Sequence, residues 1–400
     1  MNIHEYQAKK ILSEYGIKIP KGGIAYTPTE AKKVALKASA RGPWMLKAQI
    51  QSGARNLGYF IEKTAGSEGG IRRIDYRRDI RSQAEQMLGA TLVTIQTGPQ
   101  GKFVGRLYVE AYLDVVKKFY LGLAVDRVKA SLTLLAALVE NDDITNMAIN
   151  SPDSILRVPL DLDGDTTPEQ VRQVSKFLKL SAKAASNLGT LINGMHRAFL
   201  EQEATMIEIN PVGVLRSGEL MALDAKISFD DNALYRHADV LRLKDDYEAS
   251  ERELQAAKDK FTYSEFEGSV GCVANGNDAA MATMDMLRQK GVGTACFLNV
   301  KGGVDKDKIA SGIKIIMTNP RVEGILINIL GGFLRCNLIA EGIVSVASDV
   351  GLNVPLVVRF EGTNKDEAKD ILQKSKLPVI MAETTEEAAT LLVKAMEDND

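Results

Sequence analysis

Hydrophobic and polar residues alternate strictly just after the middle of the chain. Ile207 and Ile209 alternate with Glu208 and Asn210, a period of two that predicts a strand with one buried face and one polar face. Pro211 follows at once, and because proline has no N–H to donate, we expect pairing to stop there. The pattern therefore predicts a short strand that carries oxygen-bearing side chains on a single face.

A second strand is expected to return beside the first. The turn at 216–218 sends the chain back through an apolar segment to Asp224. Glu208, Asn210 and Asp224 would then form a hard-oxygen site, which suits Mg²⁺ because this ion takes one or two protein carboxylates and leaves room for nucleotide phosphates. The polar edge of an ordinary hairpin is the alternative interpretation.

The organisation of the chain changes after residue 262. Five strand candidates alternate there with helical segments, which predicts a doubly wound parallel sheet; they span 269–274, 295–300, 324–330, 354–360 and 379–382. The first half mixes strands and helices without this regularity. We therefore expect an α/β chain with an α+β domain at 1–240 (small subdomain about 21–108), a charge-rich connection at 241–262 and a second domain at 263–400.

Composition excludes several classes of partner. Four hundred residues with 45% hydrophobic content can bury two or three cores, and a net charge of −2 gives no reason to expect nucleic acid or an anionic membrane. No apolar stretch reaches about 18 residues, so no spanning helix is predicted. The arginines between 72 and 81 have the spacing of a solvated helix face. Three cysteines without C-x-x-C spacing predict small buried side chains in a cytoplasmic, reducing compartment.

An ordered series of short motifs runs through nearly the whole chain. These motifs lie at 1–9, 47–49, 92–98, 208–211, 230–234, 282–285 and 331–336. In this order they resemble the β subunits of succinate–CoA ligase and its sibling, malate–CoA ligase. The resemblance implies an ATP-grasp domain followed by a flavodoxin-like CoA-ligase domain.

The nucleotide-binding residues are carried over from this resemblance. Lys47 ends an apolar strand and can hold phosphates as a point charge, although an exposed strand lysine is the alternative. The resemblance implies that Glu110 lies at the adenine end of the cleft, with Leu113 beside it. Lys118 stands where the family has a nucleotide-binding glutamate, which reverses the charge.

A glycine-rich lid over the phosphates is the part that departs most from the family pattern. Gly53, Ala54 and Arg55 match its nucleotide-binding positions, but Ala54 and Asn56 replace glycines, and about ten residues are inserted where backbone amides should approach phosphate. The family's polar Ser-Thr-Glu-Gly-Gly is replaced at 137–141 by an apolar run. Lys301 interrupts another glycine-rich turn. We expect weak ATP binding and a mobile segment at 56–68.

The resemblance also assigns a metal site and a substrate site. Asn210 and Asp224 match the Mg²⁺ ligands, with Glu208 beside them. Asn275 matches a substrate-binding asparagine, with an ordinary helix cap as the alternative. Gly332, Phe333 and Leu334 match substrate-binding positions in a strand-to-helix turn whose free amides make a ready anion site.

The resemblance implies a subunit of an enzyme. With an α subunit, the chain would join a dicarboxylic acid to coenzyme A, coupled to cleavage of ATP (or GTP) through a phosphohistidine on the α subunit. None of this chain's three histidines has a catalytic context. Succinate is the expected acid, in the tricarboxylic acid cycle. A malate–CoA ligase subunit and a diverged, non-catalytic partner of the α subunit are the alternatives.

Overall fold

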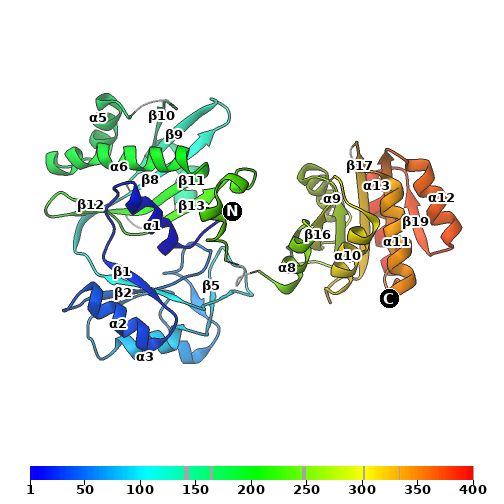
Figure 1. Ribbon diagram of the computed structural model, residues 1–400, viewed down its shortest axis with the longest axis horizontal. Coiled ribbons are helices and arrows are strands. Elements are labelled where there is room, and N and C mark those ends of the chain that lie inside the picture. The colour runs from blue at the N-terminus through cyan, green and yellow to red at the C-terminus, as the bar shows by residue number, and fades with distance from the viewer. Residues whose placement is uncertain (139–143, 163–164, 246–248, 301, 333, 400) are drawn as a thin grey trace. The chain divides into compact units, whose positions relative to one another are not determined.

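The computed structural model describes residues 1–138, 144–162, 165–245, 249–300, 302–332 and 334–399. The chain divides into two compact units, Met1–Glu248 and Ala249–Asp400 (Figure 1). The division falls inside the segment 241–262, which the charge pattern assigned to the connection.

A six-stranded antiparallel sheet forms the larger half of the first unit. Its strand order is β10-β9-β8-β11-β12, and β13 also pairs with β11. The strands are β8 (Val115–Asp126), β9 (Ser131–Ala137), β10 (Ile155–Leu160), β11 (Ala204–Leu215), β12 (Leu220–Ala222) and β13 (Ala225–Phe229). The strand β11 therefore lies inside the sheet, so its polar face is not the edge of a hairpin.

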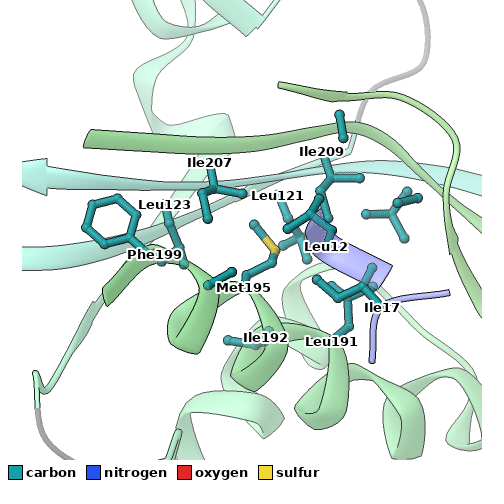
Figure 2. Close-up of a cluster of buried hydrophobic side chains, with 14 of the residues drawn as sticks. Leu12, Ile17, Leu121, Leu123, Leu191, Ile192, Met195, Phe199, Ile207 and Ile209 are labelled. Atoms are coloured by element: carbon teal, nitrogen blue, oxygen red, sulfur yellow. The ribbon is translucent and has the colours of Figure 1, made fainter. Parts of the chain in front are cut away.

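Most helices of this half cover one face of this sheet, whereas the other face carries polar residues together with a small apolar cluster against which Ile144 and Met147 pack. The helices of this half are α1 (Glu5–Glu14), α4 (Ile144–Asn150), α5 (Pro168–Phe177), α6 (Ala182–Glu201) and α7 (Ala238–Leu241). Figure 2 shows Ile207 and Ile209 of β11 among Met195 and Ile192 of α6 and Leu12 of α1. Because side chains alternate along a strand, Glu208 and Asn210 must face away from this core.

Two smaller sheets complete the first unit. One has the order β1-β7-β2-β4 and the other β3-β5-β6; their strands are β1 (Gly22–Ala25), β2 (Trp44–Ala48), β3 (Tyr59–Phe60), β4 (Ile71–Ile74), β5 (Thr91–Val93), β6 (Lys102–Phe103) and β7 (Leu107–Ala111). The helices α2 (Pro28–Ala38) and α3 (Ile80–Met87) lie beside the first of them (Figure 1). Trp44 is buried in their shared core.

The predicted arginine helix face between 72 and 81 is wrong. Arg72 and Arg73 lie on β4, and only Arg81 is in α3. Arg72 is 3% exposed, and its guanidinium donates to the carbonyls of Ala65, Glu68 and Gly69. Helical spacing misled the prediction because Arg72 is held inside by these backbone acceptors, which compensate the burial of its charge.

The second unit is a doubly wound sheet, as the sequence predicts. The parallel strands follow the order β16-β15-β17-β18-β19, with β14 antiparallel at the β16 edge. This is the flavodoxin-like order. The strands are β14 (Thr262–Glu265), β15 (Val270–Ala274), β16 (Thr294–Asn299), β17 (Gly324–Gly331), β18 (Leu356–Gly362) and β19 (Val379–Ala382).

Separate cores lie on the two faces of this sheet. Ala280 and Leu287 of α9 and Leu392 of α13 pack on one face, whereas Ile313 of α10 and Ile339 of α11 pack on the other. The helices are α8 (Glu251–Lys258), α9 (Asn277–Gln289), α10 (Lys306–Met317), α11 (Cys336–Val350), α12 (Lys365–Ser375) and α13 (Thr385–Glu397). All three cysteines are free and buried, as predicted. Within the described residues, no helix has the length and apolar character needed to cross a membrane.

Candidate nucleotide and metal site

The polar face of the large sheet carries the oxygen-bearing residues named from the sequence. Glu208 is paired in register with Lys226 of β13, and the N–H of Asn210 donates to the carbonyl of Asp224 at 3.2 Å. Asp224 comes directly before β13, so it lies beside Asn210. The expected second strand is therefore present.

The expectation that pairing stops at Pro211 is wrong. The strand β11 continues to Leu215, and its pairing with β8 shifts register between Ile209 and Val212. A bulge lets a residue that lacks an N–H pass through a sheet interior without losing a ladder hydrogen bond. The shift leaves Asn210 on an irregular stretch of strand next to the polar face.

Lys47 is the penultimate residue of strand β2 and is buried rather than exposed. Its ammonium lies 2.8 Å from a carboxylate oxygen of Glu5 and 2.7 Å from one of Glu110, and it donates to the carbonyl of Leu223 at 2.6 Å. An ammonium has three donors, so these three acceptors saturate it. Leu223 directly precedes Asp224, so Lys47 connects the small sheet to the edge of the large one where the predicted metal ligands lie.

Glu5 and Lys9 complete the cluster and were missed as site residues in the sequence. Lys9 lies 3.0 Å from Glu5 and 2.7 Å from Glu110. Glu5 also accepts from Arg55 at 2.8 Å. A signal existed, because the two residues are four apart on the buried face of an amphipathic helix, together with Ala8 and Leu12.

The cluster is electrically balanced. It joins three cations to three carboxylates: Lys9, Lys47, Arg55, Glu5, Glu110 and Asp224. Burial by itself would raise the pKa of Glu5, but the surrounding cations hold that pKa well below its ordinary value of 4.5. Burial would likewise lower the pKa of Lys47, but Glu110 and Glu5 raise it. Both groups are therefore ionised at neutral pH.

Arg55 is held against the predicted metal ligand. One guanidinium nitrogen lies 2.6 Å from Asp224 and 2.8 Å from Glu5, and another donates to the carbonyl of Ala48 at 2.8 Å. The side chain of Asp224 is 27% exposed, so its carboxylate is reachable from solvent. Arg55 thus supplies the positive charge at the position where a metal cation would contact this carboxylate.

The donors at this edge fit a magnesium ion. Within the described residues, no three His, Cys, Asp or Glu side chains gather into a metal cluster. A cation at Asp224 and Asn210 would therefore take few protein ligands and fill its shell with water or phosphate oxygens, which is the habit of Mg²⁺. Glu208 interacts with the buried Tyr120, whose pKa rises through burial and through this carboxylate.

The lid residues are tied to the protein. The N–H of Gly53 donates to the side chain of Gln96 at 2.7 Å. Ala54 has a φ of 55°, a left-handed conformation that a glycine adopts without steric cost. The substitution of a glycine noted in the sequence therefore falls where glycine is favoured. The inserted segment contains β3 and a short 3-10 helix, Lys63–Ala65, anchored by Arg72.

Three residues that were predicted to bind the nucleotide differ in how deeply they are buried. Glu110 is buried against Lys47, which is the predicted phosphate lysine. Leu113 is half-buried in the loop between β7 and β8, and Lys118 is exposed on β8 opposite Gly213. The places of Glu110 and Leu113 at the adenine end of the cleft, and the nucleotide contact in doubt at Lys118, stay predictions.

In the second unit, the side chain of Asn275 bonds to strand β17 and does not cap a helix. Its side chain donates to the carbonyl of Leu330 at 2.6 Å and accepts from the N–H of Leu330 at 2.8 Å, whereas Gly276 is the residue at the cap of α9. The helix-cap alternative is therefore wrong. Leu330 precedes Gly332 by two positions, so these bonds hold Asn275 beside the same strand end, at the carboxyl edge of the sheet.

A pocket of about 410 Å³ opens at the same edge. It is lined by residues of two loops and the helices that follow them, namely Gly303, Val304, Asp305, Lys306, Leu334, Arg335, Leu338 and Glu341. Leu334 is thus both a predicted substrate residue and part of a pocket. Phe333 and Lys301, and residues 139–141 of the altered apolar run, lie outside the described residues.

Comparisons with known proteins give matches over the full length of the chain. Residues 2–214 match the ATP-grasp domain and residues 273–393 match the CoA-ligase domain. The chain is 43% identical over 399 residues to the ADP-forming succinate–CoA ligase subunit beta of Rhodospirillum rubrum, covering 100% of both. It is 44% identical over 399 residues to the protein of the same name from Acidiphilium cryptum, again covering 100% of both. The chain belongs to this family.

The predicted family resemblance is thereby confirmed. Among solved structures, ATP citrate lyase from Methanothrix soehngenii, in complex with citrate and coenzyme A, has a TM-score of 0.70 with 14% identity. The match covers 98% of this chain and 99% of that one. At this identity the likeness concerns the fold, which supports an ATP-grasp domain followed by a CoA-ligase domain.

Proposed function

We propose that the chain is the β subunit of a succinate–CoA ligase. It would supply the nucleotide and Mg²⁺ site for the reaction of succinate, coenzyme A and ATP to succinyl-CoA, ADP and phosphate. The observation that carries this proposal is the convergence of Lys47, Arg55 and Asp224 in one buried cluster, in a chain that matches succinate–CoA ligase β subunits over its full length.

The cluster can position a nucleoside triphosphate. Lys47 would contact phosphate as a point charge, and Arg55 would contact it through its planar fork of donors. Asp224 and Asn210 would hold Mg²⁺, which neutralises phosphate charge when bound. Because Lys47 already has three acceptors, an arriving phosphate must replace one of them.

A partner subunit is needed to complete the reaction. The three histidines of the chain, at positions 4, 196 and 237, all belong to the first unit, whereas Asn275, Gly332 and Leu334 belong to the second. His4 is bonded to Asp245 at 2.6 Å. The family resemblance assigns the phosphohistidine to an α subunit, with coenzyme A and the dicarboxylic acid bound by the assembled complex.

A specific observation favours a second candidate, a diverged β subunit that binds nucleotide weakly. The cations of the cluster are all paired in this state. The N–H of Gly53 already donates to the side chain of Gln96, and Ala54 adopts a left-handed φ. Each feature removes a donor or adds strain where a nucleotide lid should close. Such a chain would retain an α-subunit interface without supporting turnover.

Co-expression with an α subunit tests both candidates. ATP-dependent phosphorylation of the α-subunit histidine, followed by succinyl-CoA formation, is expected of the assembled complex, with parallel reactions using malate and GTP to identify the acid and the nucleotide. Asp224→Ala should abolish phosphoryl transfer. A complex that assembles but never phosphorylates the histidine would favour the diverged β subunit.

A further inference from the structure

The carboxylate of Glu5 lies at the centre of the buried cluster. One of its oxygens contacts Lys47 at 2.8 Å and Lys9 at 3.0 Å. The other accepts from Arg55 at 2.8 Å and from the side chain of Gln49 at 3.3 Å. Both oxygens of a residue that is only 5% exposed are therefore used by donors from three different segments.

Glu5 joins the two cations that face the nucleotide. Lys47 is the penultimate residue of strand β2, and Arg55 lies in the turn before β3. Two positive groups repel each other at this separation, and repulsion is strong in a buried site. A carboxylate between them removes that repulsion and gives each cation a fixed direction.

The support beneath Glu5 is rigid. It begins the helix α1, whose Ala8 and Leu12 are fully buried in the core of the large sheet. The preceding residue His4 is held through its backbone N–H by Gln7 at 2.8 Å and through its ring by Asp245. Because this side chain is buried on an anchored first turn and both of its oxygens are bonded, it has little freedom and can fix the positions of the longer lysine and arginine side chains.

Attraction of the nucleotide alone gives no reason for a carboxylate at this position. A carboxylate near the phosphates repels them, and the cluster without Glu5 would carry a net positive charge that attracts a nucleotide. Any benefit of Glu5 to nucleotide binding would therefore come from preorganisation, since donors held in place before binding need no reorganisation afterwards.

We propose that Glu5 is a positioning residue of the nucleotide site, which aims Lys47 and Arg55 at the phosphates of the bound nucleotide. This inference rests on the proposed function. It predicts the direction in which Mg–ATP affinity changes when Glu5 is neutralised. Loss of a negative charge alone should strengthen anion binding, whereas loss of a positioning group should weaken it.

The test is titration of the full-length chain with Mg–ATP and, separately, with adenosine. Glu5→Gln should bind Mg–ATP at least about tenfold more weakly, since a lost charge-assisted hydrogen bond has that effect. Adenosine binding should be unchanged, because adenosine has no phosphate; a general distortion of the domain would weaken both ligands. Glu14→Gln, on an exposed position of the same helix, is the matched control and should bind as wild type.

Two further variants keep the test decisive. Glu5→Asp keeps the charge but shortens the side chain, so it should also weaken Mg–ATP binding. Glu5→Gln combined with Lys9→Met leaves two cations and two carboxylates, which protects folding if the single variant is unstable, and it should bind weakly too.

The outcomes separate the two proposals. Equal or tighter Mg–ATP binding by the folded Glu5 variants, beside a wild-type chain that binds, would overturn the positioning role and leave the proposed function intact. A wild-type complex that neither binds Mg–ATP nor phosphorylates the α subunit would overturn both.

Discussion

Replacement of Lys9 by methionine should destabilise the first unit strongly. The side chain of Lys9 is fully buried, and its ammonium is shared between Glu5 at 3.0 Å and Glu110 at 2.7 Å. Methionine has a similar length, so the loss of packing is small and the loss of charge dominates. The balanced cluster of three cations and three carboxylates would become two cations facing three carboxylates.

The magnitude follows from the burial of the cluster. Removal of one partner from a buried ion pair costs about 3–5 kcal/mol, because it leaves an uncompensated buried charge. In a unit of this size each kcal/mol lowers the melting temperature by about 2–4 °C, so a decrease of roughly 6–20 °C is expected. Lys10→Met, at the exposed neighbouring position, should change stability by no more than about 0.5 kcal/mol.

The single tryptophan of the chain makes the measurement specific. Trp44 is buried on β2 in the first unit, so its fluorescence reports unfolding of that unit alone. The double variant Lys9→Met with Glu110→Gln restores the charge balance and should recover a large part of the lost stability. If Lys9→Met and Lys10→Met have the same melting temperature, the ion pairs of the cluster do not stabilise the fold, and the reasoning is refuted.

Three other predictions concern the same unit. Because Ala54 has a φ of 55°, Ala54→Gly should raise the free energy of unfolding by roughly 0.5–1 kcal/mol in urea titration, whereas Ala185→Gly, inside α6, should lower it by about 1 kcal/mol; equal effects would contradict the strain at Ala54. The depressed pKa of Glu5 means that its contribution to stability is present above pH 4.5 and is lost as the pH falls through the folded-state pKa. The difference in unfolding free energy between wild type and Glu5→Gln should therefore hold from neutral pH to about 4.5 and shrink only below it; a difference that already shrinks between about pH 7 and 5 would exclude a depressed pKa. Arg55→Gln removes the cation that lies 2.6 Å from Asp224, so Mg²⁺ titration of the nucleotide-free chain should show tighter binding, and weaker binding would mean that Asp224 is not the metal ligand.

Local patterns in the sequence were sufficient for much of the fold. The alternation of Ile207 and Ile209 with Glu208 and Asn210 determined which face of β11 is buried, because side chains alternate along any strand. The five strand candidates of the second half became β15 to β19, since each is an apolar run between turn residues and needs no distant partner to be recognised. The ordered motifs gave the family, which the comparisons confirm.

The tertiary structure alone decided how the charged residues pair. Lys47 and Glu5 are 42 positions apart, Lys9 and Glu110 are 101 apart, and Arg55 and Asp224 are 169 apart. The period of a helix or strand carries no information over such separations. Sequence reasoning therefore named Lys47, Arg55, Glu110 and Asp224 one by one but missed Glu5, whose function comes from three cations that meet it only after α1, β2 and the lid have packed together. The passage of Pro211 through a sheet interior was decided in the same way, because the bulge that accommodates it exists only when β8 lies alongside β11.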